Sequence, residues 1–288
     1  IRMGNATVDR DGYFGTGQNF VLDKPAAGLA LVEFEAEMRR GSELFASLGV
    51  DHLIYPEVLA AQEICTSLGR PWVRNWFELH DGELIVIGVK LRENASLIGK
   101  RLRDITFGQH HYHVSAIRRR HETIIPRGDE IWEGDILYFT TTRDYVDEIR
   151  MICGKREYKI RNVMIMGGGR IAVRLVHMAK GKWNLTIIDD NMDTCRRLPE
   201  KCSGCDVNII HGDARNNELL AEEGISDMDA FVALTDFSET NILACLTAKE
   251  FQVSKTIAEV ENIQFISEAE NLNIGTVINK KLLASSKI

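Results

Sequence analysis

Between residues 162 and 278 the sequence alternates short apolar runs with amphipathic segments of helical length, and this alternation restricts the fold more than any other feature. Strands that alternate with helices of this length form βαβ units, whose strands lie parallel in one sheet. Helices then cover both faces of the sheet, which agrees with strands that are apolar at nearly every position. The pattern predicts an α/β fold with a Rossmann-like, doubly wound parallel sheet. Strands are predicted at 162–166, 185–188, 207–210, 230–234, 256–260 and 276–278, and helices at 170–180, 192–201, 216–223, 239–251 and 263–271.

The middle of the chain has a different pattern, in which short strands follow one another with glycine turns between them. Only brief helical stretches interrupt these strands, so residues 71–153 are predicted to form a smaller α+β module. The charged segment 154–161 is predicted to be the linker to the parallel-sheet domain at 162–288. In the module, strands are predicted at 84–89, 113–118, 123–125 and 136–140, and helical turns at 97–99 and 145–151.

Two distant segments share one apolar pattern: residues 48–64 and 272–288 align without a gap, and their apolar positions coincide. Such repeats indicate duplicated units, although a helix–strand–helix pattern also aligns by chance. If the repeat is genuine, residues 35–70 are the C-terminal part of a first Rossmann domain whose beginning is missing here. The chain starts with Ile1 rather than Met, which agrees with a fragment. Residues 1–34 fit neither copy and stay unassigned.

A glycine-rich loop joins the first predicted strand of the 162–288 domain to its first helix. Gly167, Gly169 and Ala172 form a Gly-x-Gly-x-x-Ala motif. The first glycine of such a motif permits a tight turn, the second lets the backbone approach a pyrophosphate, and the small third residue lets the helix pack closely on the strand. The helix N-terminus offers N–H groups to phosphates, and Arg170 adds a positive charge. The sequence therefore predicts a nucleotide site built on Gly167, Gly168, Gly169, Arg170 and Ile171.

An acidic residue in the right place strengthens this prediction, because a glycine triplet alone also fits an ordinary strand–helix turn. Asp189 lies 22 residues after Gly167, at the end of the second predicted strand. A carboxylate there accepts hydrogen bonds from ribose hydroxyls and repels a 2′-phosphate, which favours NAD or an adenine nucleotide over NADP. The alternative is that Asp189 and the adjacent Asp190 only cap the following helix.

Two more loops are expected at the same edge of the sheet, since the carboxyl ends of parallel strands meet there. Asp213 follows the third strand and is expected to bind a base or a ribose. Thr235 and Asp236 follow the fourth strand, at the crevice where the strand order reverses. The alternative for the fourth loop is an ordinary helix start marked by Ser238, Glu239 and Asn241.

Charge and missing motifs restrict the possible function. The formal net charge of −7 argues against a nucleic-acid partner, which needs a basic face. No apolar run approaches the ~18–20 residues that cross a bilayer. An NAD-dependent oxidoreductase is the alternative to a binding protein, but only His211 is placed near the crevice for proton transfer.

Two other clusters suggest metal binding, and both are weak. Residues 109–113 hold three histidines at the entry to a strand, where neighbours alternate between faces. Cys202 and Cys205 form one Cys-x-x-Cys without the second pair that closes a zinc site. We predict no metal site, and a redox or zinc sensor is the third alternative. The basic run at 118–121 is predicted to be a solvated hairpin turn.

The motifs together resemble one family. Residues 163–288 resemble the RCK-N (KTN, TrkA-N) nucleotide-binding domain, and residues 71–153 resemble the RCK-C (TrkA-C) module. The tandem order is similar to that of bacterial Trk-type potassium uptake regulators. There are three departures: the first domain lacks its glycine loop, the last module is missing, and Ala172 stands where the family often has glycine. The resemblance rests on the segments 166–172, 188–189, 212–214, 233–243, 258–262 and 277–285, and in the module on 125–129 and 132–139.

The resemblance implies a regulatory role without catalysis. The family's members are peripheral subunits at the cytoplasmic face of the plasma membrane that form homo-oligomeric rings under a membrane-embedded Trk-type potassium translocating subunit. Binding of NAD(H) or ATP/ADP changes the ring and gates transport, which needs no catalytic acid or base. Which nucleotide is the signal stays open. By resemblance, Gly167, Gly169, Arg170 and Asp189 carry the nucleotide, with Asp213, Thr235 and Asp236 as secondary assignments.

Overall fold

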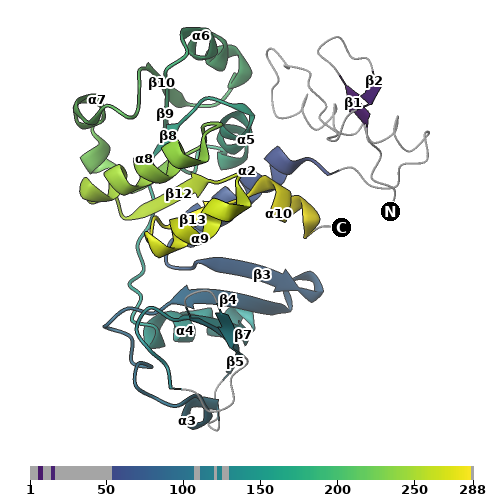
Figure 1. The fold of residues 1–288 in the computed structure, drawn as a ribbon, viewed down its shortest axis with the longest axis vertical. Coiled ribbons are helices and arrows are strands. Elements are labelled where there is room, and N and C mark those ends of the chain that lie inside the picture. The colour runs from purple at the N-terminus through teal and green to yellow at the C-terminus, as the bar shows by residue number, and fades with distance from the viewer. Residues whose placement is uncertain are drawn as a thin grey trace. The chain divides into compact units, whose positions relative to one another are not determined.

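A computed structural model describes residues 54–106, 111–119, 122–124 and 130–286, together with two short strands near the N-terminus (Figure 1). These two strands, β1 (Ala6–Val8) and β2 (Phe14–Thr16), pair antiparallel. The chain divides into two units. Of the described residues, one unit holds 6–8, 14–16, 54–65, 161–266 and 277–286, and the other holds those within 66–160 and 267–276.

The first unit is built on a six-stranded sheet with the order β10-β9-β8-β11-β12-β13. The order reverses beside β8, since the chain first moves outward through β9 and β10 and then returns to β11 on the other side. The pairings of β8 with β9 and β11, of β9 with β10, and of β11 with β12 are parallel. The strands are β8 (Asn162–Met166), β9 (Asn184–Asp189), β10 (Val207–His211), β11 (Ala230–Ala233), β12 (Lys255–Glu259) and β13 (Thr276–Ile278).

Helices join these strands, and right-handed crossovers on the two sides of the reversal place them on opposite faces of the sheet. Helix α6 packs on β9 and β10, and α8 packs on β11 and β12. Asn191 and Asn279 begin α6 and α10 with side chains that accept from backbone N–H groups in the first turn. The helices are α5 (Arg170–Ala179), α6 (Met192–Lys201), α7 (Asn217–Glu222), η3 (Ile225–Asp227), α8 (Ser238–Glu250), α9 (Ile263–Asn271) and α10 (Lys280–Ser285), with α2 (Pro56–Gly69) preceding the module.

The second unit is built on an antiparallel sheet with the order β3-β4-β7-β5-β6. Residues of β4, β5 and β7 that point to one face form its core with Ile131 and Ile149. A bulge between Val114 and Ala116 interrupts the pairing of β5 with β7. The elements are β3 (Asn75–Leu79), η1 (His80–Gly82), β4 (Leu84–Lys90), α3 (Leu102–Thr106), β5 (Tyr112–Arg119), β6 (Glu122–Ile124), β7 (Ile136–Thr141), η2 (Arg143–Tyr145) and α4 (Val146–Ile152).

The predicted fold class is confirmed: a doubly wound parallel sheet is accompanied by a smaller α+β module. Within the module, the predicted helix at 97–99 is wrong, because this segment is a turn that closes with Gly99 at a φ of +77°. The helix comes later, as α3. Strand β3 was not expected; three of its five residues are exposed, so its sequence lacks the apolar signal of a buried strand.

The prediction of a solvated turn at 118–121 is also wrong for its first two residues. Arg118 and Arg119 belong to β5, where Arg118 pairs with Glu270 and Arg119 pairs with Asp135. A buried carboxylate needs a charged partner, and Asp135 is almost fully buried. Local sequence does not show this requirement.

The predicted repeat is described only in part. Helices α2 and α10 begin at Pro56 and Lys280, which are equivalent positions in the alignment. The preceding strand of the first copy lies outside the described residues, as do the side chains of residues 1–34. The first-domain assignment therefore stays a prediction. Among the described residues, no helix combines the length and apolar content that a bilayer crossing requires.

Two leucines of the first unit test where its stability resides. Leu175 on α5 is fully buried, whereas Leu243 on α8 is 64% exposed. We expect Leu175→Ala to lower the free energy of unfolding by about 2–5 kcal/mol, because a buried cavity replaces packed atoms. Leu243→Ala is expected to change it by less than about 0.5 kcal/mol. Urea denaturation measures both, and equal effects would contradict the described core.

Candidate functional site

The turn after β8 requires its first glycine. Gly167 has a φ of +97°, a backbone conformation that side chains disfavour, and its N–H donates to the Ile188 carbonyl at 2.8 Å. A Cβ atom at this position would lie 2.9 Å from the carbonyl oxygen of Leu234. The backbones of β8, β9 and β11 therefore meet at Gly167 too closely for any side chain.

The next two glycines differ in their surroundings. The N–H of Gly168 donates to the Asp189 carboxylate at 2.6 Å, and a Cβ there would lie 2.7 Å from a methyl group of Leu198. At Gly169 a Cβ would have no atom within 4 Å. Gly169 is also the N-cap of α5 and offers no side chain to the N–H groups of the first turn. Protein packing thus explains the first two glycines, whereas Gly169 leaves bare backbone and open space at a helix N-terminus, as an approaching phosphate needs.

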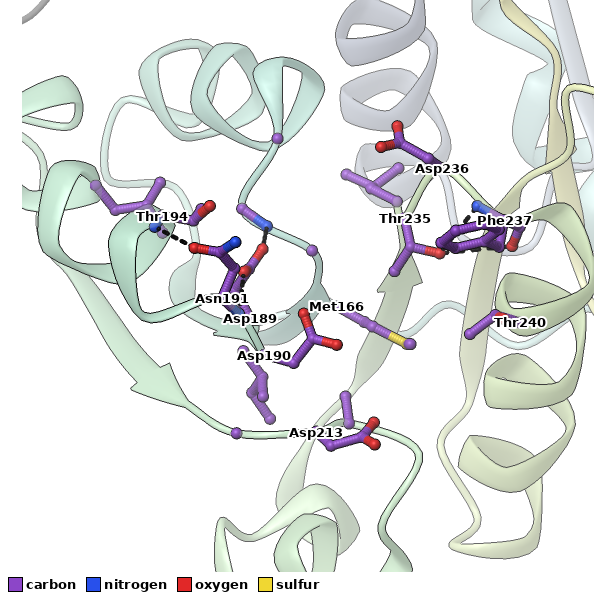
Figure 2. A pocket seen from close by; sticks show the side chains of 18 of the residues that line it. Met166, Asp189, Asp190, Asn191, Thr194, Asp213, Thr235, Asp236, Phe237 and Thr240 are labelled. Carbon is purple, nitrogen blue, oxygen red and sulfur yellow. Dashed lines mark hydrogen bonds between the residues drawn. The ribbon is translucent and has the colours of Figure 1, made fainter.

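The loops after β8, β9, β10 and β11 enclose a pocket of about 450 Å³. In Figure 2, Asp189 and Asp190 lie across the pocket from Thr235, Phe237 and Thr240. Of the predicted site residues the structure brings together Gly167, Gly168, Gly169, Arg170, Asp189, Asp213, Thr235 and Asp236. The exception is Ile171, which does not line the pocket because its side chain is buried in the core.

Asp189 connects the glycine loop to the second strand. One carboxylate oxygen accepts from Gly168 N–H, and the other accepts from Asn191 N–H at 2.9 Å. The alternative that Asp189 and Asp190 cap α6 is wrong, since the side chain of Asn191 is the cap. Each oxygen of Asp189 has a second lone pair, so the carboxylate can still accept from a ligand hydroxyl. Asp190 is exposed and also lines the pocket.

Asp213 has a partner that the sequence analysis missed. Arg215 holds it with two guanidinium nitrogens, at 2.9 and 2.8 Å. These hydrogen bonds lower the pKa of the Asp213 carboxyl below its ordinary value. Arg215 therefore balances the negative charge of the Asp213 carboxylate, which is not an unpaired acceptor. The sequence signal for this pair is an arginine two positions after the aspartate. Many exposed turns have the same spacing, so it did not single out this pair.

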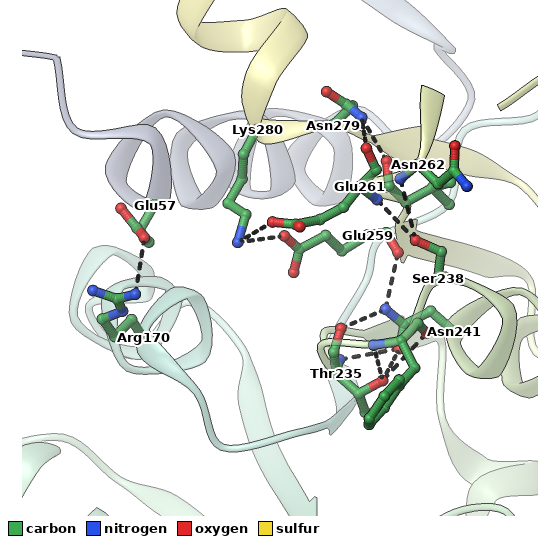
Figure 3. A network of polar contacts seen from close by, with 12 residues as sticks. Glu57, Arg170, Thr235, Ser238, Asn241, Glu259, Glu261, Asn262, Asn279 and Lys280 are labelled. Atoms are coloured by element: carbon green, nitrogen blue, oxygen red, sulfur yellow. Dashed lines mark hydrogen bonds and ion pairs between the residues drawn. The ribbon is translucent and has the colours of Figure 1, made fainter. Parts of the chain in front are cut away.

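A buried amide holds the loop after β11. Asn241 is fully buried; its Nδ2 donates to the carbonyl oxygens of Thr235 and Glu259, and its Oδ1 accepts from the Thr235 hydroxyl at 2.7 Å. Ser238 instead accepts from Glu261 N–H (Figure 3). The alternative of a helix start is borne out, because α8 begins at Ser238, although its N-cap is Phe237, with no side-chain cap. These bonds fix Thr235 beside the pocket.

The histidines and cysteines considered as metal ligands do not form a cluster in the part of the chain that the structure describes. No group of three or more His, Cys, Asp or Glu side chains could hold a metal ion there. The Cys205 thiol lies 3.5 Å from His177 Nδ1, while burial raises the pKa of Cys202 to about 11. Residues 109 and 110 lie outside the described residues.

Two family models match this chain. Residues 163–280 match the TrkA-N domain, which includes every lining residue of the pocket. Residues 86–154 match the TrkA-C domain, which lies in the second unit.

Curated relatives are longer than this chain, and the matched stretch covers about half of each. The Trk system potassium uptake protein TrkA of Halomonas elongata is 29% identical over 247 residues, which are 84% of this chain and 53% of the relative. A TrkA homolog of Archaeoglobus fulgidus is 29% identical over 243 residues, which are 84% of this chain and 55% of that relative. The chain spans about half the length of the curated relatives it matches.

Solved structures share the fold. The crystal structure of the GsuK RCK domain matches with a TM-score of 0.58 and 15% identity, covering 85% of this chain and 53% of that one. A GsuK channel bound to NAD matches with a TM-score of 0.57 and 15% identity. The match covers 85% of this chain and 44% of the GsuK chain.

The glycines allow a test of turn geometry. Gly167→Ala is expected to lower the free energy of unfolding by about 1–3 kcal/mol, because alanine disfavours a positive φ and collides with Leu234. Gly169→Ala is expected to change it by less than about 0.5 kcal/mol, since its Cβ meets open space. Thermal or urea denaturation separates the two, and the opposite ranking would show that the loop has another shape.

Proposed function

The chain contains a TrkA-C domain followed by a TrkA-N domain, and from this premise we propose that it is a nucleotide-sensing regulatory subunit of a Trk-type potassium uptake system. The observation that carries the proposal is the meeting of three features in one pocket. These are the bare backbone at Gly169, the N-terminus of α5 and the carboxylate of Asp189.

The ligand in this proposal is NAD(H) or ATP/ADP. Its phosphates lie against Gly169 and the first turn of α5, where N–H groups and the helix dipole favour anions. A ribose hydroxyl donates to Asp189, which the bond from Gly168 holds in place. Asp213, Thr235 and Asp236 supply contacts from the other two loops. The NAD-bound GsuK channel shares the fold and supports this choice of ligand class, as does the family match.

The proposed output is a change in transport by a membrane partner. The Trk system names of the curated relatives support a potassium-translocating partner at the cytoplasmic face of the membrane, and the RCK fold supports assembly into a homo-oligomeric ring. A nucleotide gates such a partner only by binding two states of the assembly with different affinities. Both the ring and the partner concern the whole length of such proteins, and the match covers 53% of the Halomonas elongata relative.

The proposal includes binding without turnover. His211 was the candidate for proton transfer, but it is not a lining residue, and its Nε2 lies 3.1 Å from the carbonyl oxygen of Asp190. The names of the relatives also support regulation rather than catalysis.

Calorimetric titration with NAD, NADH, ADP and ATP tests the proposed function directly. We expect saturable binding of at least one nucleotide to the intact chain. A parallel assay follows the absorbance of reduced nicotinamide with a panel of carbonyl compounds. Absence of binding would overturn the nucleotide sensor, and saturable hydride transfer would favour the oxidoreductase instead.

The role of Asp189 is testable against a second aspartate. Asp189→Ala is expected to weaken nucleotide binding by about 1–2 kcal/mol, because it removes the ribose acceptor and the bond that positions Gly168. Asp193→Ala, the matched control, is expected to change the affinity by less than about 0.5 kcal/mol, since Asp193 is exposed and does not line the pocket. Equal losses at the two positions would argue against a specific ribose contact.

A further inference from the structure

The turn after α6 holds two cysteines that the proposed function does not use. Cys202 follows the last residue of α6, and Cys205 comes three residues later. The N–H of Cys205 donates to the carbonyl oxygen of Cys202 at 3.0 Å, and Gly204 has a φ of +78°. This hydrogen bond closes a β-turn, in which the first and fourth Cα atoms lie less than about 7 Å apart. A disulfide joins residues whose Cα atoms are about 4.4–6.8 Å apart, so the turn brings its two cysteines within reach of one.

The two cysteines differ in exposure. Both thiols are free, but Cys202 is 2% exposed, whereas Cys205 is half-buried. The residues between them, Ser203 and Gly204, are exposed, and a Cβ atom at Gly204 would meet open space. A small molecule can therefore approach the turn from solvent, and it reaches Cys205 before Cys202.

A buried histidine faces the more accessible thiol. His177 on α5 is 4% exposed, and its Nε2 lies 2.8 Å from the carbonyl oxygen of Lys201. A carbonyl oxygen only accepts hydrogen bonds, so Nε2 carries the proton, and Nδ1 of a neutral imidazole is then an acceptor. Nδ1 lies 3.5 Å from Cys205 Sγ. The histidine is thus held in the tautomer that can take the proton of Cys205, which is how a neighbouring base activates a cysteine nucleophile.

Burial disfavours the thiolate form of both cysteines. It raises the pKa of Cys205 above its ordinary value and that of Cys202 to about 11. The thiolate is the reactive form, so the reaction of Cys205 depends on a base that removes its proton. A dithiol whose thiolate is not stabilised also gives up its electrons more readily than one with a low pKa. The surroundings therefore favour a disulfide at this turn, provided that His177 supplies the base.

We propose that Cys202 and Cys205 form a redox site that a low-molecular-weight disulfide oxidises reversibly, with His177 as the base. His177 Nδ1 takes the proton of Cys205, and the thiolate attacks one sulfur of the small disulfide. The S–S bond of that molecule breaks, and its other sulfur leaves as a thiol with the proton from His177.

The second step closes the protein disulfide. The thiol of Cys202 attacks Cys205 Sγ in the mixed disulfide, its proton passes to the departing sulfur, and a second small thiol leaves. The cysteine pair has then lost two electrons and two protons, and the small disulfide has gained both. An excess of the small thiol reverses the two steps. Nothing in this chemistry requires a bound nucleotide.

Incubation of the intact chain with oxidised and reduced glutathione in graded ratios tests the site. After an acid quench, the remaining thiols are alkylated in denaturant and counted by mass spectrometry. We expect the wild type to lose two of its six thiols as one intramolecular disulfide, which peptide mapping places between Cys202 and Cys205. Six free thiols in a large excess of oxidised glutathione, or a disulfide between other cysteines, would overturn the proposal.

Serine variants separate the roles of the two thiols. Cys202→Ser is expected to accumulate a mixed disulfide of Cys205 with glutathione, because no second thiol resolves it. Cys205→Ser is expected to keep Cys202 as a free thiol, because that residue is buried. Cys65→Ser, which removes a half-buried thiol on α2, is the matched control and is expected to form the disulfide as the wild type does. A mixed disulfide on Cys202 instead of Cys205 would overturn the assigned order of attack.

His177→Gln tests the base. Glutamine can still donate to the Lys201 carbonyl but does not take a proton from a thiol. We expect the rate of disulfide formation to fall at least about tenfold, while the equilibrium ratio of dithiol to disulfide stays within about twofold. Melting temperatures verify that the variant folds. An unchanged rate, or equal shifts in rate and equilibrium, would show that His177 only packs against the turn.

Discussion

The reversal of strand order between β8 and β11 is the constraint on which the rest of this structure depends. Helices leave the sheet toward opposite faces on the two sides of that point, so the loops after β8 and β11 separate and leave a crevice. No side chain can fill the turn itself, since the backbone of Leu234 lies too close to Gly167. The pocket is therefore a result of chain topology, and the side chains around it only determine what it accepts.

Several polar groups around the pocket have structural partners as well as a proposed ligand role. Asp189 accepts from Gly168, Arg215 holds Asp213, and Asn241 holds the loop of Thr235. These bonds restrict each group to one orientation before a ligand arrives. Preorganisation of this kind lowers the entropy that binding must overcome. It also means that removing one group disturbs the loop that carries it.

Much of the larger unit could be predicted because its signals are local. Apolar strands alternate regularly with amphipathic helices, asparagines cap several of the helices, and the glycine loop marks the first crossover. The module was harder to predict. Strand β3 is mostly exposed and carries little apolar pattern, and the predicted helix at 97–99 is a turn that ends at Gly99 with a φ of +77°. Ile171 is the predicted site residue that does not line the pocket, because the helix turns its side chain into the core.

The sequence by itself determined the parallel sheet, the glycine loop after its first strand and the acid after its second, because each depends on neighbours along the chain. Only the tertiary structure decided which charges are paired. Arg170 has Glu57 beside it, and Arg118 has Glu270, although neither pair is close in sequence. A salt bridge depends on the distance between side chains after packing, and periodicity carries no information about that distance. Fold and loop therefore follow from sequence pattern, whereas the electrostatic character of the pocket follows from the packing of elements distant in the chain.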